Sequence, residues 1–340
     1  MRIVSTSSTS CRQAGRRRRV GVASGATLAL LAVGAAPPPG ERIELPVRLV
    51  MLSDGTPRFG VPVRIAGQEV EAGLDTGSTG LRVMARALPA GAADGGADVR
   101  YGYGSGTVLA GPEVELPVGF GTGAATPTRI QRVERLTCMP TRPQCPVTRN
   151  GDPATFGIQG DGLSNEGFAA ILGVNLRPSH QPNPFETAGV RRWIVELPVP
   201  GRAGPGRIVL NPTEAEVAGY RPVRFADDDN SLPGCIGGGR AIGTICGPAT
   251  LDTGAPGLRI VQATGHAAVA PGTVATLQLG QGNSAVAWQV TTERREDGSH
   301  LSFEQRGDAA APRLFLGVAP YYRFSILYDA DAHTVGFKPR

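Results

Sequence analysis

The residues best suited to chemistry are two aspartates, each within a copy of the same short stretch. Residues 74–82 read Leu-Asp-Thr-Gly-Ser-Thr-Gly-Leu-Arg, and residues 251–259 read Leu-Asp-Thr-Gly-Ala-Pro-Gly-Leu-Arg. Seven of the nine positions are identical, and the copies begin 177 residues apart. A single Asp-Thr-Gly is weak evidence because aspartate and glycine are common in turns. The matching copies indicate a duplicated unit, in which each half supplies one carboxylate, Asp75 or Asp252, to a shared site.

Two carboxylates held close together are suited to the hydrolysis of a peptide bond by water. This reaction needs one base that activates the water and one acid that protonates the leaving groups. Neighbouring carboxylates cannot both ionise, so they share a proton, and Asp75 and Asp252 could take one role each. Gly77 and Gly254 would let the backbone turn sharply and bring N–H groups near the carboxylates. The alternative interpretation is two unrelated aspartate turns.

Other catalytic arrangements have little support in the sequence. It contains no Gly-x-Ser-x-Gly and no His-Glu-x-x-His motif. The four histidines are scattered and form no helical pair: His180, His266, His300 and His333. We therefore expect neither a metal site nor a cofactor.

The cysteines favour an oxidising compartment. Cys11 lies near the N-terminus, and the other four form two close pairs, Cys138 with Cys145 and Cys235 with Cys246. Four cysteines allow three pairings, and the local pairing closes one small loop in each half of the chain. The alternative is a zinc site, but the spacings are Cys-x6-Cys and Cys-x10-Cys rather than Cys-x2-Cys. We expect two local disulfides, as in exported proteins.

The duplicated motif resembles that of the pepsin-type aspartic peptidases. In that family each Asp-Thr-Gly loop is followed later in the same lobe by two apolar residues and a glycine, matched here by residues 171–173 and 315–317. The family's flap hairpin, Tyr-Gly-x-Gly-Ser, is matched by residues 101–105, and the matches together cover about residues 60–337. The resemblance implies an all-β, pepsin-like acid protease fold with two pseudo-symmetric, β-barrel-like lobes and a cleft between them.

The resemblance also implies a role for each site residue. Asp75 and Asp252 would be catalytic, while Thr76 and Thr253 would hydrogen-bond across the lobe interface. The residues expected to support the site are Thr76, Gly77, Ser78, Thr253 and Gly254. The residues expected to form the flap and contact the substrate are Tyr101, Gly102, Tyr103 and Gly104, although the same glycine-rich stretch could be an ordinary loop.

The two copies differ at the position after Asp-Thr-Gly, which is Ser78 in the first and Ala255 in the second. In the family a hydroxyl at this position donates to its own aspartate and favours the charged form. The shared proton should therefore reside mainly on Asp252, leaving Asp75 as the base. Pepsins usually have a tryptophan seven residues after the first catalytic aspartate, where it partners the flap tyrosine. This chain has Arg82 there, so the role of Tyr101 is open, and a surface-directed arginine is the alternative.

The N-terminal segment has the pattern of a signal peptide. Met1–Arg19 contains six arginines and no acidic residue, and Val20–Ala36 is apolar and rich in small residues. We expect residues 1–35 to be cleaved after Ala35 and the mature chain to be periplasmic or secreted. The alternative is an uncleaved N-terminal anchor. No basic prosegment of the kind found in animal pepsins is expected.

Charge argues against a nucleic-acid partner. The whole chain has 34 basic and 29 acidic residues, and without the six leader arginines it has 28 basic and 29 acidic residues. The mature protein is therefore nearly neutral, and no remaining basic run is long enough to follow a phosphate backbone.

The remaining sequence predicts short strands in two lobes, 36–190 and 191–340. Glycine and proline together account for 77 of 340 residues, which leaves little room for long helices. A hairpin is expected from Val61–Ile65, a turn and Glu69–Leu74, which would place Asp75 at the end of a strand. Other strands expected from apolar alternation are Arg42–Val50, Glu113–Val118, Trp193–Leu197, Arg207–Leu210, Val274–Leu279 and Ala285–Val290. The family resemblance implies further strands at Thr155–Ile158, Phe168–Val174, Val217–Phe225, Phe324–Tyr328 and Val335–Phe337, with Asn183–Val190 as the crossover.

These features lead to two functional hypotheses. The first is an exported, monomeric aspartic endopeptidase that hydrolyses a peptide or protein substrate and has no membrane span in its mature chain. The second is a catalytically silent, pepsin-like envelope protein that binds a peptide or protein partner. Two intact Asp-Thr-Gly loops favour the enzyme, and the substituted tryptophan favours the binding protein.

Overall fold

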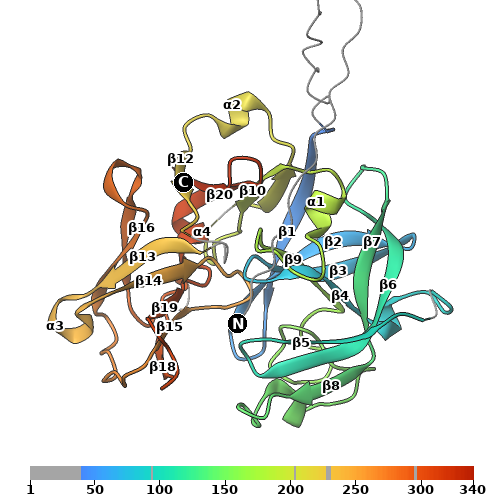
Figure 1. Cartoon of the computed structure of the whole chain (residues 1–340), viewed down its shortest axis with the longest axis horizontal. Coiled ribbons are helices and arrows are strands. Elements are labelled where there is room, and N and C mark those ends of the chain that lie inside the picture. The colour runs from blue at the N-terminus through green and yellow to red at the C-terminus, as the bar shows by residue number, and fades with distance from the viewer. Residues whose placement is uncertain (1–39, 93–94, 203, 227–230, 295–296) are drawn as a thin grey trace, which may run out of the picture. The chain divides into compact units, whose positions relative to one another are not determined.

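The computed structural model describes residues 40–92, 95–202, 204–226, 231–294 and 297–340 (Figure 1). The expected signal peptide, residues 1–35, lies outside the described residues. Among the described residues, no helix is both long enough and apolar enough to cross a membrane.

The described residues form one compact unit that is predominantly β, with two sheets. The longest described α-helix, α4 (Ala319–Arg323), has only five residues. The others are α1 (Pro184–Thr187), α2 (Glu214–Val217) and α3 (Gly239–Ile242), with 3-10 helices η1 (Ala85–Ala87), η2 (Pro146–Thr148) and η3 (Gly282–Ser284). The expectation of an all-β chain, drawn from its glycine and proline content, is confirmed.

The larger sheet has fourteen strands in the order β12-β21-β20-β10-β11-β1-β2-β3-β9-β4-β7-β6-β5, with β8 paired to β6. The strands are β1 (Ile43–Met51), β2 (Pro57–Ile65), β3 (Gln68–Asp75), β4 (Thr79–Met84), β5 (Asp98–Gly102), β6 (Thr107–Gly119), β7 (Thr126–Val133), β8 (Arg135–Cys138), β9 (Ala170–Val174), β10 (Arg192–Glu196), β11 (Gly206–Leu210), β12 (Arg221–Arg224), β20 (Phe324–Asp329) and β21 (Thr334–Pro339).

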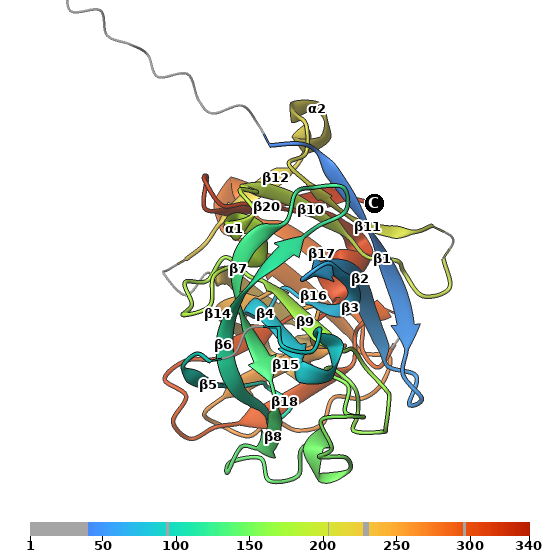
Figure 2. The same ribbon diagram turned by 90° about the vertical axis from the view of Figure 1, so that its right-hand side faces the viewer.

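Strand β1 pairs with one strand from each half of the chain. Its first part, Ile43–Val47, pairs with β11, and its second part, Arg48–Met51, pairs with β2. The blue ribbon of β1 can be followed past β11 and β2 in Figure 2. The larger sheet thus contains strands from both sides of residue 190, and the division into lobes at that residue stays a prediction.

The smaller sheet is built entirely from the second half of the chain, in yellow to red in Figure 1. Its seven strands follow the order β17-β16-β13-β14-β19-β15-β18. Their bounds are β13 (Leu232–Gly237), β14 (Thr244–Thr250), β15 (Leu258–Gln262), β16 (Val274–Leu279), β17 (Val286–Thr291), β18 (Leu301–Gln305) and β19 (Arg313–Phe315).

The two sheets contain the same four-strand arrangement around the two Asp-Thr-Gly loops. In the first, β9 lies parallel to β3 and antiparallel to β4, and β4 lies parallel to β7. In the second, β19 lies parallel to β14 and antiparallel to β15, and β15 lies parallel to β18. The loop of Asp75 connects β3 to β4, and the loop of Asp252 connects β14 to β15. The duplication read from the nonapeptides therefore extends to the strand pairing around them.

The hairpin expected around Ala66–Gln68 is present, since β2 pairs with β3 and Ile65 faces Gln68. Two other expectations need correction. Thr155–Ile158 is not a strand and contributes only a single bridge from Ile158 to Phe168. The segment Asn183–Val190, expected to carry the crossover, lies between β9 and β10 and contains α1, whose N-terminus is capped by the Asn183 side chain accepting from the Phe185 N–H.

The second correction concerns Val217–Phe225, of which only β12 is a strand. Helix α2 begins after Thr213, where Thr213 and Glu216 form a reciprocal capping box, and it includes Val217 as its last residue. The longer strand that the family resemblance implied is thus replaced at its start by a short helix. Strands β4, β5, β7, β8, β13, β14, β15, β18 and β19 were not anticipated as separate strands.

Both expected disulfides are present. Cys138 pairs with Cys145, and Cys235 pairs with Cys246. The second joins β13 to β14 at residues that face each other in the register. Each bond closes a loop within one half of the chain, as the spacing predicts.

Candidate active site

The two aspartates occupy equivalent turns. Asp75 is the last residue of β3 and is only 4% exposed, whereas Asp252 follows β14 and is partly exposed. The Gly77 N–H donates to Asp75 Oδ1 at 2.8 Å, and the Gly254 N–H donates to Asp252 Oδ1 at 2.9 Å. Each glycine therefore brings a backbone donor onto the carboxylate two residues before it.

The two turns approach each other closely. A Cβ atom added to Gly254 would lie 3.0 Å from an oxygen of Asp75 and 3.0 Å from an oxygen of Asp252, so these oxygens are no further apart than twice that distance. A Cβ atom added to Gly77 would lie 2.5 Å from Cγ of Asp252. Neither glycine has a positive φ. Glycine is thus required here by the space between the turns, and the expected approach of the two loops is present.

Thr76 and Thr253 connect the two turns through a symmetric set of hydrogen bonds. The Thr76 N–H donates to Thr253 Oγ1 at 3.1 Å, and the Thr253 N–H donates to Thr76 Oγ1 at 3.0 Å. The Thr76 hydroxyl donates to the Leu251 carbonyl at 3.0 Å, and the Thr253 hydroxyl donates to the Leu74 carbonyl at 2.9 Å. Both threonines are buried, with at most 1% exposure. Because each loop is bonded to the other, the separation of the two carboxylates is fixed by the fold.

The environment of the two carboxylates is asymmetric. The Ser78 hydroxyl donates to Asp75 Oδ2 at 2.5 Å, as expected, and Ala255 offers Asp252 no such donor. Burial raises the pKa of Asp252 to about 7, and the charge of Asp75 and a hydrogen bond with it act in the same direction. A neighbouring carboxylate disfavours the charged form of the other, so Asp252 is the group that retains the proton at mildly acidic pH.

The stretch identified as a flap forms the tip of the hairpin between β5 and β6. The Tyr103 N–H donates to the Thr107 carbonyl and the Gly106 N–H donates to the Tyr103 carbonyl, which closes the turn. Tyr103 packs against a buried apolar cluster that includes Ile171. Gly102 and Gly104 are exposed. The ordinary-loop alternative is therefore replaced by a hairpin whose tyrosines face inward.

Arg82 contacts this hairpin and does not point to solvent. The side chain is 1% exposed, and its guanidinium carbon lies 3.5 Å from the centre of the Tyr101 ring. Nη2 donates to the Thr79 carbonyl at 3.1 Å, which holds the guanidinium in place. The surface-directed alternative is wrong, because the planar guanidinium lies over the Tyr101 ring.

Arg259, the matching residue of the second copy, has a different environment. Its guanidinium lies 4.3 Å from the Phe315 ring centre, and Nη1 is 3.1 Å from a carboxylate oxygen of Glu304. Glu304 also forms an ion pair with Arg142 of the first half. The repeated arginine thus serves the flap in one half and an ion-pair cluster in the other.

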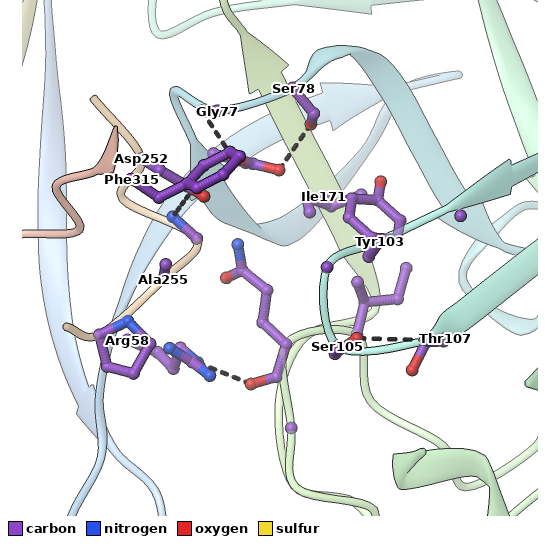
Figure 3. A pocket seen from close by; sticks show the side chains of 18 of the residues that line it. Arg58, Gly77, Ser78, Tyr103, Ser105, Thr107, Ile171, Asp252, Ala255 and Phe315 are labelled. Atoms are coloured by element: carbon purple, nitrogen blue, oxygen red, sulfur yellow. Dashed lines mark hydrogen bonds between the residues drawn. The ribbon is translucent and has the colours of Figure 1, made fainter. Parts of the chain in front are cut away.

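A pocket of about 340 Å³ contains both carboxylates. It is lined by the two Asp-Thr-Gly turns, the flap tip, Phe156–Gly160 and Arg58 of β2. Figure 3 shows Tyr103 and Ile171 on one side of this pocket and Arg58 and Ala255 on the other. Volumes of this size are typical of ligand sites.

Arg58, Gln159 and Phe315 were not identified as site residues from the sequence. Arg58 and Arg64 are an even number of residues apart on β2, so both belong to the same face of the strand in the sequence pattern. The Arg64 guanidinium, however, donates to the carbonyls of Gly121 and Gly123, away from the pocket. The sequence pattern therefore held no signal that could separate the two arginines. Among the described residues, no group of three or more His, Cys, Asp or Glu side chains is placed to hold a metal ion.

A comparison with models of known protein families finds no match to this chain, and a search of curated proteins finds no match either.

Proposed function

We propose that the protein is an exported aspartic endopeptidase with the two-lobed pepsin-like fold. The observation that carries the proposal is the pair of Asp-Thr-Gly turns, which crossed threonine hydrogen bonds hold together so that Asp75 and Asp252 line one pocket. The repeated strand arrangement around the turns supports the fold assignment, and the two disulfides support export to an oxidising compartment.

The asymmetry of the pair assigns the roles. Asp75, ionised and bonded by the Ser78 hydroxyl, takes a proton from a water molecule, and the resulting hydroxide attacks the carbonyl carbon of the peptide. Asp252 gives its proton to the carbonyl oxygen, forming a tetrahedral diol. The proton on Asp75 then passes to the leaving nitrogen as the C–N bond breaks, and a diol proton returns to Asp252. The Gly77 and Gly254 N–H groups keep the carboxylates oriented throughout.

The flap has the role of covering the substrate. Its tip is a short hairpin whose exposed glycines can approach a bound peptide, and closure over the peptide excludes bulk water from the reacting atoms. The Arg82 guanidinium contacts the face of the Tyr101 ring. The missing tryptophan favoured the binding-protein hypothesis, and the Arg82–Tyr101 contact gives the tyrosine another flat partner.

The experiment that tests the proposal is cleavage of a denatured protein mixture by the purified chain at acidic pH, with and without a statine-type inhibitor. We expect new peptide fragments that disappear when the inhibitor is present. Fragments that persist unchanged with the inhibitor would assign the cleavage to another mechanism.

A further inference from the structure

The pocket contains one cation whose hydrogen-bonding capacity is largely unused. Arg58 of β2 lines the same pocket as Asp75 and Asp252. Its Nε donates to the Gln159 carbonyl at 2.7 Å, and this is the only hydrogen bond of the side chain within the described part of the chain. Nη1 is buried and has no hydrogen-bond partner among the described residues. Leaving a buried donor unpaired costs stability unless a ligand supplies the acceptor.

The Nε bond fixes the direction of the guanidinium. Figure 3 shows this bond as a dashed line and shows Arg58 on the Ala255 side of the pocket. With Nε held by a backbone carbonyl, the edge formed by Nη1 and Nη2 is the edge left for a ligand. That edge carries parallel N–H groups, whose spacing matches the two oxygens of a carboxylate.

Arg58 is not the counter-ion of the catalytic pair. Within the described residues it forms no ion pair with Asp75 or Asp252, although their charges act on it from a distance. Burial lowers the pKa of Arg58, but an arginine remains charged across the range in which proteins work. The other two arginines near the pocket are occupied, Arg82 by Tyr101 and Arg259 by Glu304.

We infer that Arg58 forms a subsite for a carboxylate of the substrate, so that the enzyme prefers peptides carrying a negative charge at one position near the cleaved bond. The inference rests on the proposed peptidase function. The carboxylate could belong to a glutamate or aspartate side chain or to the C-terminus of the peptide. Because the catalytic pair itself carries a negative charge, an acidic substrate would be repelled from this pocket unless a cation faced it. Arg58 provides that cation.

The test uses acetylated octapeptide amides that are otherwise uncharged and that carry glutamate or glutamine at each position in turn. A third set has glutamine throughout and a free C-terminal carboxylate. Cleavage is measured at a pH between the ordinary pKa of glutamate, about 4.3, and the pKa of Asp252, about 7. At such a pH the carboxylate of the peptide is charged and Asp252 is protonated. Binding of the same peptides to the Asp75→Asn variant is measured in parallel by calorimetry.

We expect one glutamate position, or the free C-terminus, to raise kcat/KM roughly tenfold or more over its neutral match. Arg58→Gln should abolish this preference, so that the acidic peptide and its neutral match are cleaved with equal kcat/KM, and an unchanged circular dichroism spectrum shows that the variant is folded. Arg58→Lys should retain part of the preference. Arg64→Gln, on the same strand but bonded away from the pocket, is the matched control and should keep all of it.

The outcomes separate this inference from the proposed function. Equal cleavage of every acidic peptide and its neutral match by the wild-type chain would overturn the subsite and leave the peptidase intact. Cleavage of no peptide would count against the peptidase, and the binding measurement would then decide the subsite. Tighter binding of an acidic peptide than of its neutral match, with the difference lost in Arg58→Gln, would support the subsite. Equal binding of the acidic peptide and its neutral match would overturn the subsite.

Discussion

At the scale of single residues, one hydroxyl distinguishes the two halves of the site. Ser78 donates to Asp75, while the matched residue Ala255 cannot donate to Asp252. The resulting asymmetry was predicted from the two nonapeptides because it depends only on residue type at equivalent positions. Arg58 could not be predicted in the same way, since its role depends on the bond from its Nε to the Gln159 carbonyl, which leaves Nη1 without a partner among the described residues.

The pH–activity profile should report this asymmetry. Activity requires the proton on Asp252, so it should fall as the pH rises through about 7. In Ser78→Ala the pair loses a bond that favours its charged form, so the acid limb of the profile should move to higher pH. Ala255→Ser should move one of the two limbs to lower pH. An acid limb that stays in place in Ser78→Ala would show that this hydroxyl does not set the asymmetry.

The space between the two turns gives a second prediction for single residues. Gly77→Ala places a Cβ atom 2.5 Å from Cγ of Asp252, so the turns must separate or the carboxylate must turn away. We expect a loss of kcat of roughly a hundredfold or more, as for other small displacements of reacting groups. The control is Gly307→Ala, where an added Cβ meets nothing within 4 Å. Full activity in Gly77→Ala would contradict the closeness of the two turns.

At the scale of elements, several strands with clear apolar alternation were predicted, and many strands without it were not. Strands β16 and β17 follow the period expected of half-buried strands. Strand β13 contains Gly234 and Gly237 and has few apolar side chains to reveal its period. The error at residues 217–225 has another cause: this strand was expected from the family resemblance, whereas the Thr213–Glu216 capping signal in the sequence begins a helix that runs to Val217.

The contact between Arg82 and the flap gives a prediction for an element. Arg82→Ala removes the stacking of the guanidinium on Tyr101, worth about 0.5–2 kcal/mol, so kcat/KM should fall roughly two- to thirtyfold. Arg82→Trp restores a flat partner and should recover part of the loss. The control is Arg100→Ala on β5, the strand that carries Tyr101, since this arginine is exposed. Equal activity of Arg82→Ala and the wild-type chain would show that the contact does not position the flap.

At the scale of the whole molecule, segments 177 residues apart are joined at the site. The sequence predicted this meeting through its duplicated motif. It did not predict the shared sheet, because the pairing of β1 with both β2 and β11 depends on long-range register that no local pattern reveals.

The threonine contact should therefore contribute to the stability of the whole fold. Thr76→Val or Thr253→Val leaves a buried N–H of the opposite turn without its acceptor, which should cost about 1–3 kcal/mol in the free energy of unfolding. Chemical denaturation of the purified variants measures this directly. Thr276→Val, an exposed change on β16, is the control and should have little effect. Unfolding midpoints unchanged in both buried variants would mean that the two turns are held by other contacts.

The most direct measurement of the shared site is peptide hydrolysis by Asp75→Asn and Asp252→Asn, each compared with the wild-type chain at equal folded concentration. Since the two carboxylates act on one water molecule, each substitution alone should abolish turnover while the circular dichroism spectrum stays unchanged. Retained turnover in either variant, with the wild-type chain active, would contradict a site made from both aspartates.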